Sequence, residues 1–259
     1  MKTTSILGVK VTNEKKEKVL EYLFDRLTNP SNKTFIITPN PEMLIYASNH
    51  LAYQDKLNRA DISLADGVGL LLAGRIMNKP LEERITGVDF IEDVCSKASE
   101  KPLSIGFLGG KAGVAERTAE CLLAKYPELT VVFAGSEWPS NNRLKIKDLG
   151  LKNKKEKDLT SSILNHKSID ILFVAYGVPK QEEWIFDNLP NLTVKAAMGV
   201  GGSFDFLSGD VPRAPRAVRA MGMEWLFRLI LQPWRFKRQL ALIEFVFLVL
   251  KEKITTDKK

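Results

Sequence analysis

The sequence predicts an α/β fold with a mostly parallel, Rossmann-like sheet that is covered by helices on both faces. Short apolar runs alternate with longer helix-like stretches, which indicates parallel strands joined by helical crossovers. The 259 residues are 44% hydrophobic and 27% charged, enough for a substantial core. Composition changes late in the chain. We therefore expect an α/β core over 1–212 and a helical, basic and apolar C-terminal appendage over 213–259.

The expected strands are apolar runs that each end in a loop: 34–40, 61–67, 103–110, 129–135, 168–177 and 193–202. The expected helices between them are 41–60, 112–126 and 180–189. Pro41 suits the first turn of a helix, where its missing N–H costs nothing. The lysine-rich segment 136–160 interrupts this rhythm, and we expect a surface excursion between a strand and the next helix.

Ligands of such folds bind at the carboxyl ends of the parallel strands. Here the strand-end segments are the ones richest in glycine, proline and polar residues: 38–40, 66–67, 109–110, 177–181 and 199–205. We therefore expect these segments to form one shared site.

The net charge of +7 is concentrated at the C-terminal end. Residues 213–259 contain eleven Lys and Arg and four Asp and Glu, whereas residues 1–212 contain 27 of each kind. Such an excess predicts an anionic partner surface, either nucleic acid or membrane. Arginines alternate with tryptophans here, and the apolar run 240–250 is too short to span a bilayer. Two interpretations stay open: a helix lying in a membrane interface, or a terminal helix docked on the core.

Several common chemistries have no motif in this sequence. It contains no Asp-x-Asp for a metal-bound diphosphate, no P-loop and no G-x-S-x-G nucleophile elbow. His50 and His166 are isolated, which argues against a metal site. Cys95 and Cys121 have neither metal-ligand nor CxxC spacing, and we expect two buried thiols in a reducing compartment. The first residues contain no apolar h-region, so we expect no signal peptide.

Eight motifs follow one another in order: TPNPEML, LADGVGL, ERITGVDF, LGGKAGVAE, YGVPKQEEW, GVGGSFDFLSG, RAP and EWLFRLILQPWR. Together they resemble the WecG/TagA/CpsF glycosyltransferases, glycosyltransferase family 26, over residues 5–240. The resemblance implies an inverting transfer of N-acetylmannosamine from UDP-ManNAc, without metal or cofactor. The implied acceptor is GlcNAc on undecaprenyl diphosphate. The β-1,4-linked product is an early intermediate of wall teichoic acid or a related surface polysaccharide.

The resemblance places catalytic residues at five positions. Asp66 is expected to be the general base for the acceptor hydroxyl; the alternative is an Asx-turn residue. Thr38 and Asn40 are expected to bind sugar hydroxyls or phosphate, or else to cap the next helix. Arg84 would neutralise the diphosphate, or form a surface salt bridge. Gln181 would hydrogen-bond a sugar.

Further substrate-binding positions are expected at Gly109, Gly110, Gly177, Lys180, Gly201, Gly202, Asp205, Arg213 and Arg216. The glycines would let a ligand approach the backbone, although each also suits a tight turn. Lys180 would contact phosphate or stay solvated. Asp205 ranks below Asp66 as a base, and Glu182 is either a rival base or a favourable first-turn acid. The arginines would meet anionic headgroups or the lipid diphosphate. No metal ligand is expected.

The lipid acceptor implies a cytoplasmic protein bound peripherally to the inner face of the bacterial cell membrane, with an anionic membrane surface as a partner. No nucleic-acid partner is expected, because the apolar stripe of the tail exceeds what phosphate binding requires. Three alternatives stay open: an oligomer of identical chains, another donor such as UDP-ManNAcA or UDP-glucose, and a non-catalytic scaffold at the membrane.

Overall fold

The computed structural model describes residues 1–29, 32–139 and 168–257. The chain forms two compact units, each assembled from segments that are distant in the sequence and each described by itself below. Unit 1 consists of Met1–Val19, Thr38–Thr86 and Pro212–Lys259, and unit 2 of Leu20–Ile37 and Gly87–Val211. The boundary expected at residue 212 therefore falls where the chain passes from unit 2 to unit 1. The treatment of 213–259 as a separate appendage stays a prediction.

The larger sheet has six strands, and five of them lie in unit 2 and run parallel, which confirms the predicted fold class. Along the sheet these five are β3 (Thr34–Ile37), β8 (Val194–Gly199), β7 (Ile169–Ala175), β5 (Ser104–Gly109) and β6 (Thr130–Gly135). Every residue of β5 and β7 is buried. This explains their uninterrupted apolar sequences, because a parallel strand covered on both faces has no solvent side.

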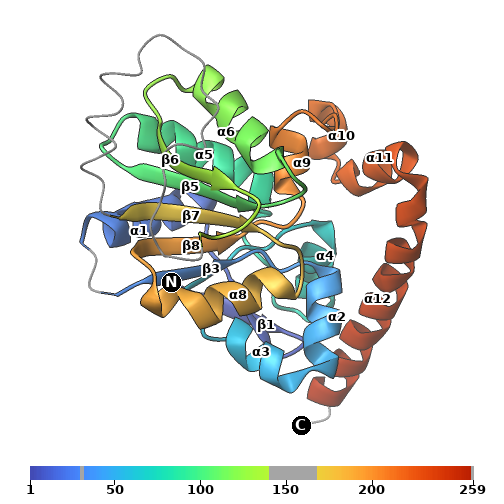
Figure 1. Ribbon diagram of the computed structural model, residues 1–259. Helices are drawn as coiled ribbons and strands as arrows, with labels where there is room; N and C mark the ends of the chain where they lie inside the picture. Colours follow the sequence, from blue (N-terminus) through green and yellow to red (C-terminus); the bar gives the residue numbers. More distant parts are fainter. Residues whose placement is uncertain (30–31, 140–167, 258–259) are drawn as a thin grey trace, which may run out of the picture. The chain divides into compact units, whose positions relative to one another are not determined.

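Helices cover both faces of this sheet, as predicted (Figure 1). Helices α5 (Gly87–Ser99) and α6 (Val114–Lys125) lie on one face, and α6 packs on β5 and β6. Helix α8 (Lys180–Asn188) lies on the other face and packs on β3, β7 and β8. Unit 2 also contains most of α1 (Lys16–Thr28) and the short α9 (Ser203–Leu207). The predicted alternation of strands and helices is therefore present.

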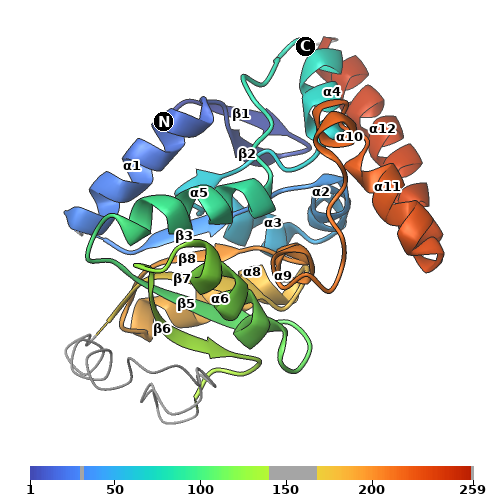
Figure 2. The ribbon, with the colours of Figure 1, turned by 90° about the horizontal axis from the view of Figure 1, so that it is seen from above.

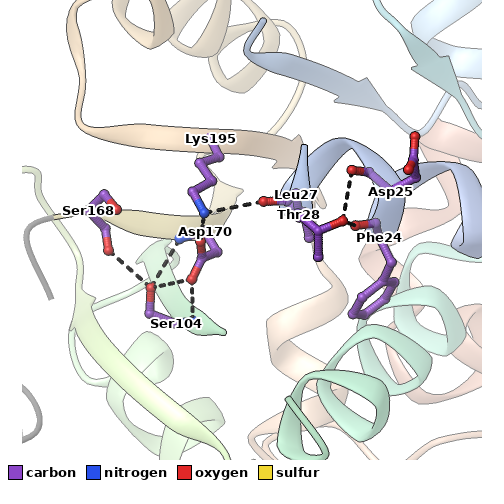
Figure 3. A network of polar contacts seen from close by, with 8 residues as sticks. All are labelled: Phe24, Asp25, Leu27, Thr28, Ser104, Ser168, Asp170 and Lys195. Atoms are coloured by element: carbon purple, nitrogen blue, oxygen red, sulfur yellow. Dashed lines mark hydrogen bonds and ion pairs between the residues drawn. The ribbon is translucent and has the colours of Figure 1, made fainter. Parts of the chain in front are cut away.

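A buried polar network joins three neighbouring strands at their amino ends (Figure 3). Asp170 on β7 accepts hydrogen bonds from the backbone N–H of Ser104 at 2.7 Å and from its hydroxyl at 2.9 Å. Lys195 Nζ on β8 lies 2.6 Å from the other Asp170 oxygen and donates to the carbonyl of Leu27 at 3.2 Å. Asp170 is 5% exposed, so these partners offset the cost of burying its charge.

Unit 1 begins with the antiparallel hairpin of β1 (Thr3–Ile6) and β2 (Val9–Thr12). Its other early elements are α2 (Pro41–Asn49), α3 (Leu51–Leu57), β4 (Ile62–Ser63) and α4 (Val68–Ile76). The prediction of one helix over 41–60 is wrong. His50 leaves the helical conformation, at φ −136° and ψ 84°, so α2 ends there and α3 starts anew.

The C-terminal part of unit 1 is helical: α10 (Arg216–Ala220), α11 (Glu224–Leu231), the 3₁₀ turn η3 (Pro233–Arg235) and α12 (Phe236–Asp257). Helix α12 packs along α2 and α4 (Figures 1 and 2). Phe245 and Val249, one turn apart, are 2% and 0% exposed. Ile243, Phe247, Leu250 and Ile254 are exposed. Helix α12 is therefore docked along one side, as the second interpretation of the tail expects, and it exposes several apolar side chains on the other. The membrane-interface interpretation stays a prediction.

Three further expectations concern single residues or segments. Cys95 is buried in α5 as expected, but Cys121 on α6 is exposed, so the prediction of two buried thiols is wrong for Cys121. Only residues 136–139 of the expected surface excursion belong to the described part of the chain, and 140–160 lie outside it, as does His166. No helix among the described residues is both long enough and apolar enough to cross a membrane.

Candidate functional site

Three loops of unit 1 carry four of the five predicted catalytic residues, and backbone hydrogen bonds hold these loops side by side. The N–H of Asp66 donates to the carbonyl of Pro39 at 3.0 Å. The N–H of Ile85 donates to the carbonyl of Ala65 at 3.1 Å. The loop before α2, the loop before α4 and the segment around Arg84 are therefore neighbours.

Asn40 has a clear local role. Its side chain accepts a hydrogen bond from the N–H of Met43 at 3.0 Å, so it is the N-cap of α2, with Pro41 in the first turn. The capping alternative is thus present in the structure, and a sugar contact would have to coexist with it. Thr38 directly follows β3 and is 5% exposed. Its predicted contact with a ligand stays a prediction.

Asp66 lies at the point where the chain turns from β4 into α4. It is half-buried, and Gly67 behind it has a φ of +94°. No atom lies within 4 Å of the position that a Cβ of Gly67 would occupy, so the backbone beside Asp66 is open. The role of Asp66 as a general base stays a prediction.

Arg84 is half-buried and contacts the C-terminal segment of the same unit. Its Nη2 donates to the carbonyl oxygen of Arg219 at 3.0 Å. This is neither the surface salt bridge nor, by itself, the diphosphate contact that the sequence suggested. A guanidinium has five N–H donors, so one bond to a carbonyl leaves the charge and the other donors for an anion.

The two arginines predicted to bind substrate differ in their surroundings. Arg213 Nε lies 3.3 Å from Glu224 Oε1, and the two side chains are each 18% exposed. Arg216, the first residue of α10, is exposed. Arg213 is therefore held in an ion pair, whereas Arg216 faces solvent and is the freer of the two to meet an anionic surface.

Gly222 places this C-terminal segment next to the start of α4. Its φ is +73°, and a Cβ at this position would come within 2.3 Å of Val68 Cγ1. Val68 is the first residue of α4, two residues after Asp66. The close approach of backbone to side chain requires glycine, because any other residue would force the two segments apart.

In unit 2, the predicted glycines lie at the carboxyl ends of β5, β7 and β8, which are neighbours in the sheet. Gly109 ends β5, Gly177 follows β7, and Gly201 follows β8. Gly110 N–H donates to the carbonyl of Ala175 at 3.0 Å, which ties the first of these loops to the second strand. The sheet therefore brings Gly109, Gly110, Gly177, Gly201 and Gly202 to one edge, as predicted.

Gln181 lies between two of these loops. Its Oε1 accepts hydrogen bonds from the N–H of Gly177 at 3.1 Å and from the N–H of Gly201 at 2.9 Å. Its Nε2 donates to Glu182 Oε1 at 2.6 Å, and Gln181 is 1% exposed. The predicted contact of Gln181 with a sugar stays a prediction.

Lys180 and Asp205 flank this arrangement in unit 2. Lys180 is the exposed first residue of α8, and Asp205 lies in α9, half-buried. The carbonyl of Asp205 accepts from Val211 N–H at 2.9 Å. Beyond α9, a hydrogen bond from Arg117 lowers the pKa of the Asp210 carboxyl. This ion pair is exposed, so it anchors the loop weakly.

Aromatic contacts fix the start of α8 against the end of β7. The rings of Tyr176 and Trp184 meet edge to face with centroids 5.8 Å apart, and Trp184 also lies 5.9 Å from Trp138. Burial raises the pKa of the Tyr176 phenol. Such ring pairs add stability beyond the area they bury, so the loop after β7 has a firm base.

Two residues of these sites have neighbours that their own stretch of sequence does not reveal. Gly222 had no signal beyond its position between two helical stretches, because its importance depends on Val68. Glu182 was considered only as a rival base or a first-turn acid. It is 0% exposed, and its position beside Gln181 in the sequence was the one signal that could have indicated a joint role.

The predicted residues thus form two groups. Thr38, Asn40, Asp66 and Arg84 lie together in unit 1, and the glycines, Lys180, Gln181 and Asp205 lie together in unit 2. A carboxylate, a hydroxyl and a guanidinium on adjoining loops can accept a proton and neutralise an anion. Within the described residues, no group of three His, Cys, Asp or Glu side chains is arranged to hold a metal ion. Metal independence stays a prediction.

Comparison with known proteins gives this chemistry a context. The model of the Glycosyl transferase WecG/TagA/CpsF family matches residues 4–259. A Bacillus subtilis (strain 168) protein named N-acetylglucosaminyldiphosphoundecaprenol N-acetyl-beta-D-mannosaminyltransferase is 31% identical over 254 residues, which cover 98% of this chain and 93% of that protein.

Proteins of the same name in two other organisms show similar agreement. The Staphylococcus aureus (strain MRSA252) protein is 30% identical over 96% of this chain and 92% of its own length. The Bacillus spizizenii protein is 29% identical over 100% of this chain and 95% of its own length. The match therefore extends over both units, and the chain belongs to the WecG/TagA/CpsF family of glycosyltransferases.

Proposed function

We propose that this glycosyltransferase moves N-acetylmannosamine from UDP-ManNAc to the GlcNAc of undecaprenyl-diphosphate-GlcNAc. The linkage formed is β-1,4, with inversion at the anomeric carbon and without a metal. The reaction serves an early step of wall teichoic acid or related surface polysaccharide synthesis. The observation that carries this proposal is the end-to-end similarity to relatives named for N-acetylmannosaminyl transfer to N-acetylglucosaminyldiphosphoundecaprenol.

In the proposed mechanism, Asp66 accepts the proton of the acceptor hydroxyl as the hydroxyl oxygen attacks the anomeric carbon. The bond to the donor phosphate breaks, and UDP leaves with its electron pair. Arg84 neutralises the charge that develops on the diphosphate, which a metal-free enzyme must stabilise by other means. The proximity of the Asp66 and Arg84 loops, joined through Ala65 and Ile85, supports this division of roles.

The proposed location is the inner face of the cytoplasmic membrane, where the lipid acceptor resides. The exposed side of α12, with Ile243, Phe247, Leu250 and Ile254, supports this location, as does the basic excess of residues 213–259. Truncation near residue 212 would test it poorly, because Phe245 and Val249 are buried in unit 1. The triple change Ile243→Ser, Phe247→Ser and Ile254→Ser should abolish binding to anionic vesicles while the protein stays folded. Unchanged binding would contradict the proposal.

The experiment for the function is transfer from UDP-ManNAc to a short-chain lipid-diphosphate-GlcNAc in the presence of EDTA. Wild type should form product, and Asp66→Asn should lose about 10²-fold or more of the rate. Asp55→Asn, an exposed acid of α3 in the same unit, is the matched control and should behave like wild type. If wild type and Asp66→Asn form product at equal rates, Asp66 is not the general base, and Asp205 is the next candidate to test.

The identity of the donor sugar is the part of the proposal with the most alternatives. UDP-ManNAcA and UDP-glucose offered in the same assay separate the alternative donors. A non-catalytic scaffold would bind vesicles and form product with none of the three. Transfer from one donor at a rate far above the other two would assign the donor sugar and exclude the scaffold.

A further inference from the structure

We propose that Gln181 and Glu182 form a buried clasp that positions the loops after β7 and β8, and that Glu182 is a positioning residue for the transfer reaction. The effect on transfer rests on the proposed function. The clasp itself rests on contacts within unit 2. In this proposal Gln181 acts through the two loops that it joins, in place of a direct contact with a sugar.

The side chain of Gln181 joins the loop after β7 to the loop after β8. One oxygen, Oε1, accepts the N–H of Gly177 at 3.1 Å and the N–H of Gly201 at 2.9 Å. These two residues belong to loops that follow different strands, 24 positions apart in the sequence. At 1% exposure the amide is shielded from water, so both bonds persist without solvent competition. A single side chain therefore fixes the separation of the two loops.

Glu182 decides which way the Gln181 amide points. Its Oε1 accepts from Gln181 Nε2 at 2.6 Å, and the residue is 0% exposed. A reversed amide would direct its NH₂ group at two N–H donors and its oxygen at a carboxylate, which is unfavourable at every contact. The carboxylate thus selects the one orientation in which Gln181 can bind both loops.

The end of β8 is shaped to admit this pair. A Cβ on Gly199 would lie 3.0 Å from Glu182 Oε1 and 3.1 Å from Gln181 Nε2. The two side chains therefore lie directly against the backbone of β8, and a larger residue at position 199 would push them away. Three glycines, Gly177, Gly199 and Gly201, surround one buried amide and one buried carboxylate.

The clasped loops carry residues of unit 2 that the sequence predicts to bind substrate, and in this proposal they contact the UDP-sugar donor. Lys180 follows the first loop directly, and Gly202 belongs to the second, with Asp205 one turn beyond. Backbone held in one conformation binds a ligand without the cost of ordering it, so loosening the loops should weaken binding of the donor. The clasp therefore predicts a change in donor affinity from residues that are themselves buried.

The test uses a swap of the two residues in the full-length protein. Gln181→Glu places two carboxylates in contact and should open the clasp. The double variant Gln181→Glu, Glu182→Gln restores it, because the new carboxylate accepts both N–H groups and the new amide donates to that carboxylate. Glu182→Met removes the acceptor, and Glu182→Gln keeps an acceptor oxygen. Glu183→Met, in the same turn of α8, is the matched control.

Two readouts apply to each variant: hydrogen–deuterium exchange in peptides that contain Gly177 and Gly201, and KM for UDP-ManNAc alongside kcat. Gln181→Glu and Glu182→Met should speed exchange in both loops and raise KM by about tenfold, roughly the effect of one lost hydrogen bond to a charged group. The swap and Glu182→Gln should return within about threefold of wild type. Glu183→Met should match wild type.

The outcomes separate the two proposals. Exchange that stays at the wild-type level in Gln181→Glu and Glu182→Met overturns the clasp, and so does a swap that recovers no more than Gln181→Glu alone. A wild-type protein that forms no product and does not bind UDP overturns the proposed function. The exchange pattern would still decide the clasp in that case, because it needs no substrate.

Discussion

Arg84 Nη2 donates a hydrogen bond to the carbonyl oxygen of Arg219 at 3.0 Å, between residues 135 positions apart in the chain. The contact ties the C-terminal segment of unit 1 to the segment that adjoins the Asp66 loop. A residue suggested by the sequence as a diphosphate ligand is thus also a structural anchor. Its substitution should affect both the transfer reaction and the local stability of α10.

Arg84→Ala should speed hydrogen exchange in 214–222 and lower kcat/KM for transfer at least about tenfold. The loss of a hydrogen bond from a charged group should lower the free energy of unfolding by about 1.5–3 kcal/mol. Arg84→Lys keeps the charge without the planar fork and should fall between wild type and Arg84→Ala. Arg75→Ala, an exposed arginine of α4, is the control. If Arg84→Ala loses activity while hydrogen exchange in 214–222 stays at the wild-type level, Arg84 contacts the ligand but does not anchor the C-terminal segment.

Gly222→Ala should destabilise the protein more than Gly209→Ala. Both glycines have positive φ, +73° and +78°, but a Cβ meets Val68 Cγ1 at 2.3 Å only at position 222 and meets no atom within 4 Å at position 209. The left-handed backbone costs each variant about 1–2 kcal/mol, and overpacking adds about 1–3 kcal/mol to Gly222→Ala. Urea unfolding measures the difference. Adding Val68→Ala should recover part of it, and equal midpoints for the two glycine variants would contradict the close approach.

Lys195→Met should lower the free energy of unfolding more than Asp170→Asn. Lys195→Met leaves the buried Asp170 carboxylate without its cation, whereas in Asp170→Asn an amide oxygen can still accept from Ser104 and the Lys195 side chain, 32% exposed, can be hydrated. We expect losses of about 3 kcal/mol for Lys195→Met and about 1–2 kcal/mol for Asp170→Asn. Lys125→Met, which breaks the more exposed pair with Glu92, should change the stability by less than about 1 kcal/mol.

The same Asp170 variant should leave the affinity for UDP unchanged. Its network lies at the amino ends of β5, β7 and β8, whereas the predicted substrate-binding residues of unit 2 lie beyond the carboxyl ends of these strands. Calorimetry with UDP, well below the unfolding midpoint, measures this. Weaker binding by a folded Asp170→Asn protein would show that the two ends of the sheet are coupled.

One thiol per folded chain should react with a thiol reagent at neutral pH, and the second only after unfolding. Cys121 is exposed, whereas Cys95 is buried. Burial raises the pKa of the Cys95 thiol, and the nearby charge of Glu92 raises it further, so Cys95 holds its proton. Cys121→Ser should therefore leave the folded protein unreactive. Rapid labelling of that variant would show that α5 opens readily.

Features that depend on neighbours in the chain were predictable from the sequence. The apolar runs of β5 and β7, the cap formed by Asn40 and the first-turn position of Pro41 each follow from a few consecutive residues. The parallel sheet follows from the order of strands and helices. The family was indicated by the order of eight short motifs, each a run of consecutive residues.

Features that depend on residues distant in the sequence were decided only by the tertiary structure. Cys95 and Cys121 lie in similar helical stretches, yet packing buries one and exposes the other. The sequence of residues 213–259 alone did not indicate which side of α12 packs on α2 and α4. In the structure Phe245 is buried on the packed side, whereas Phe247 is exposed to solvent. The partners of Arg84 and Gln181 are also distant in the sequence, at Arg219 and Gly201. A hydrogen-bonding side chain can accept many partners, and the fold determines which one lies within reach.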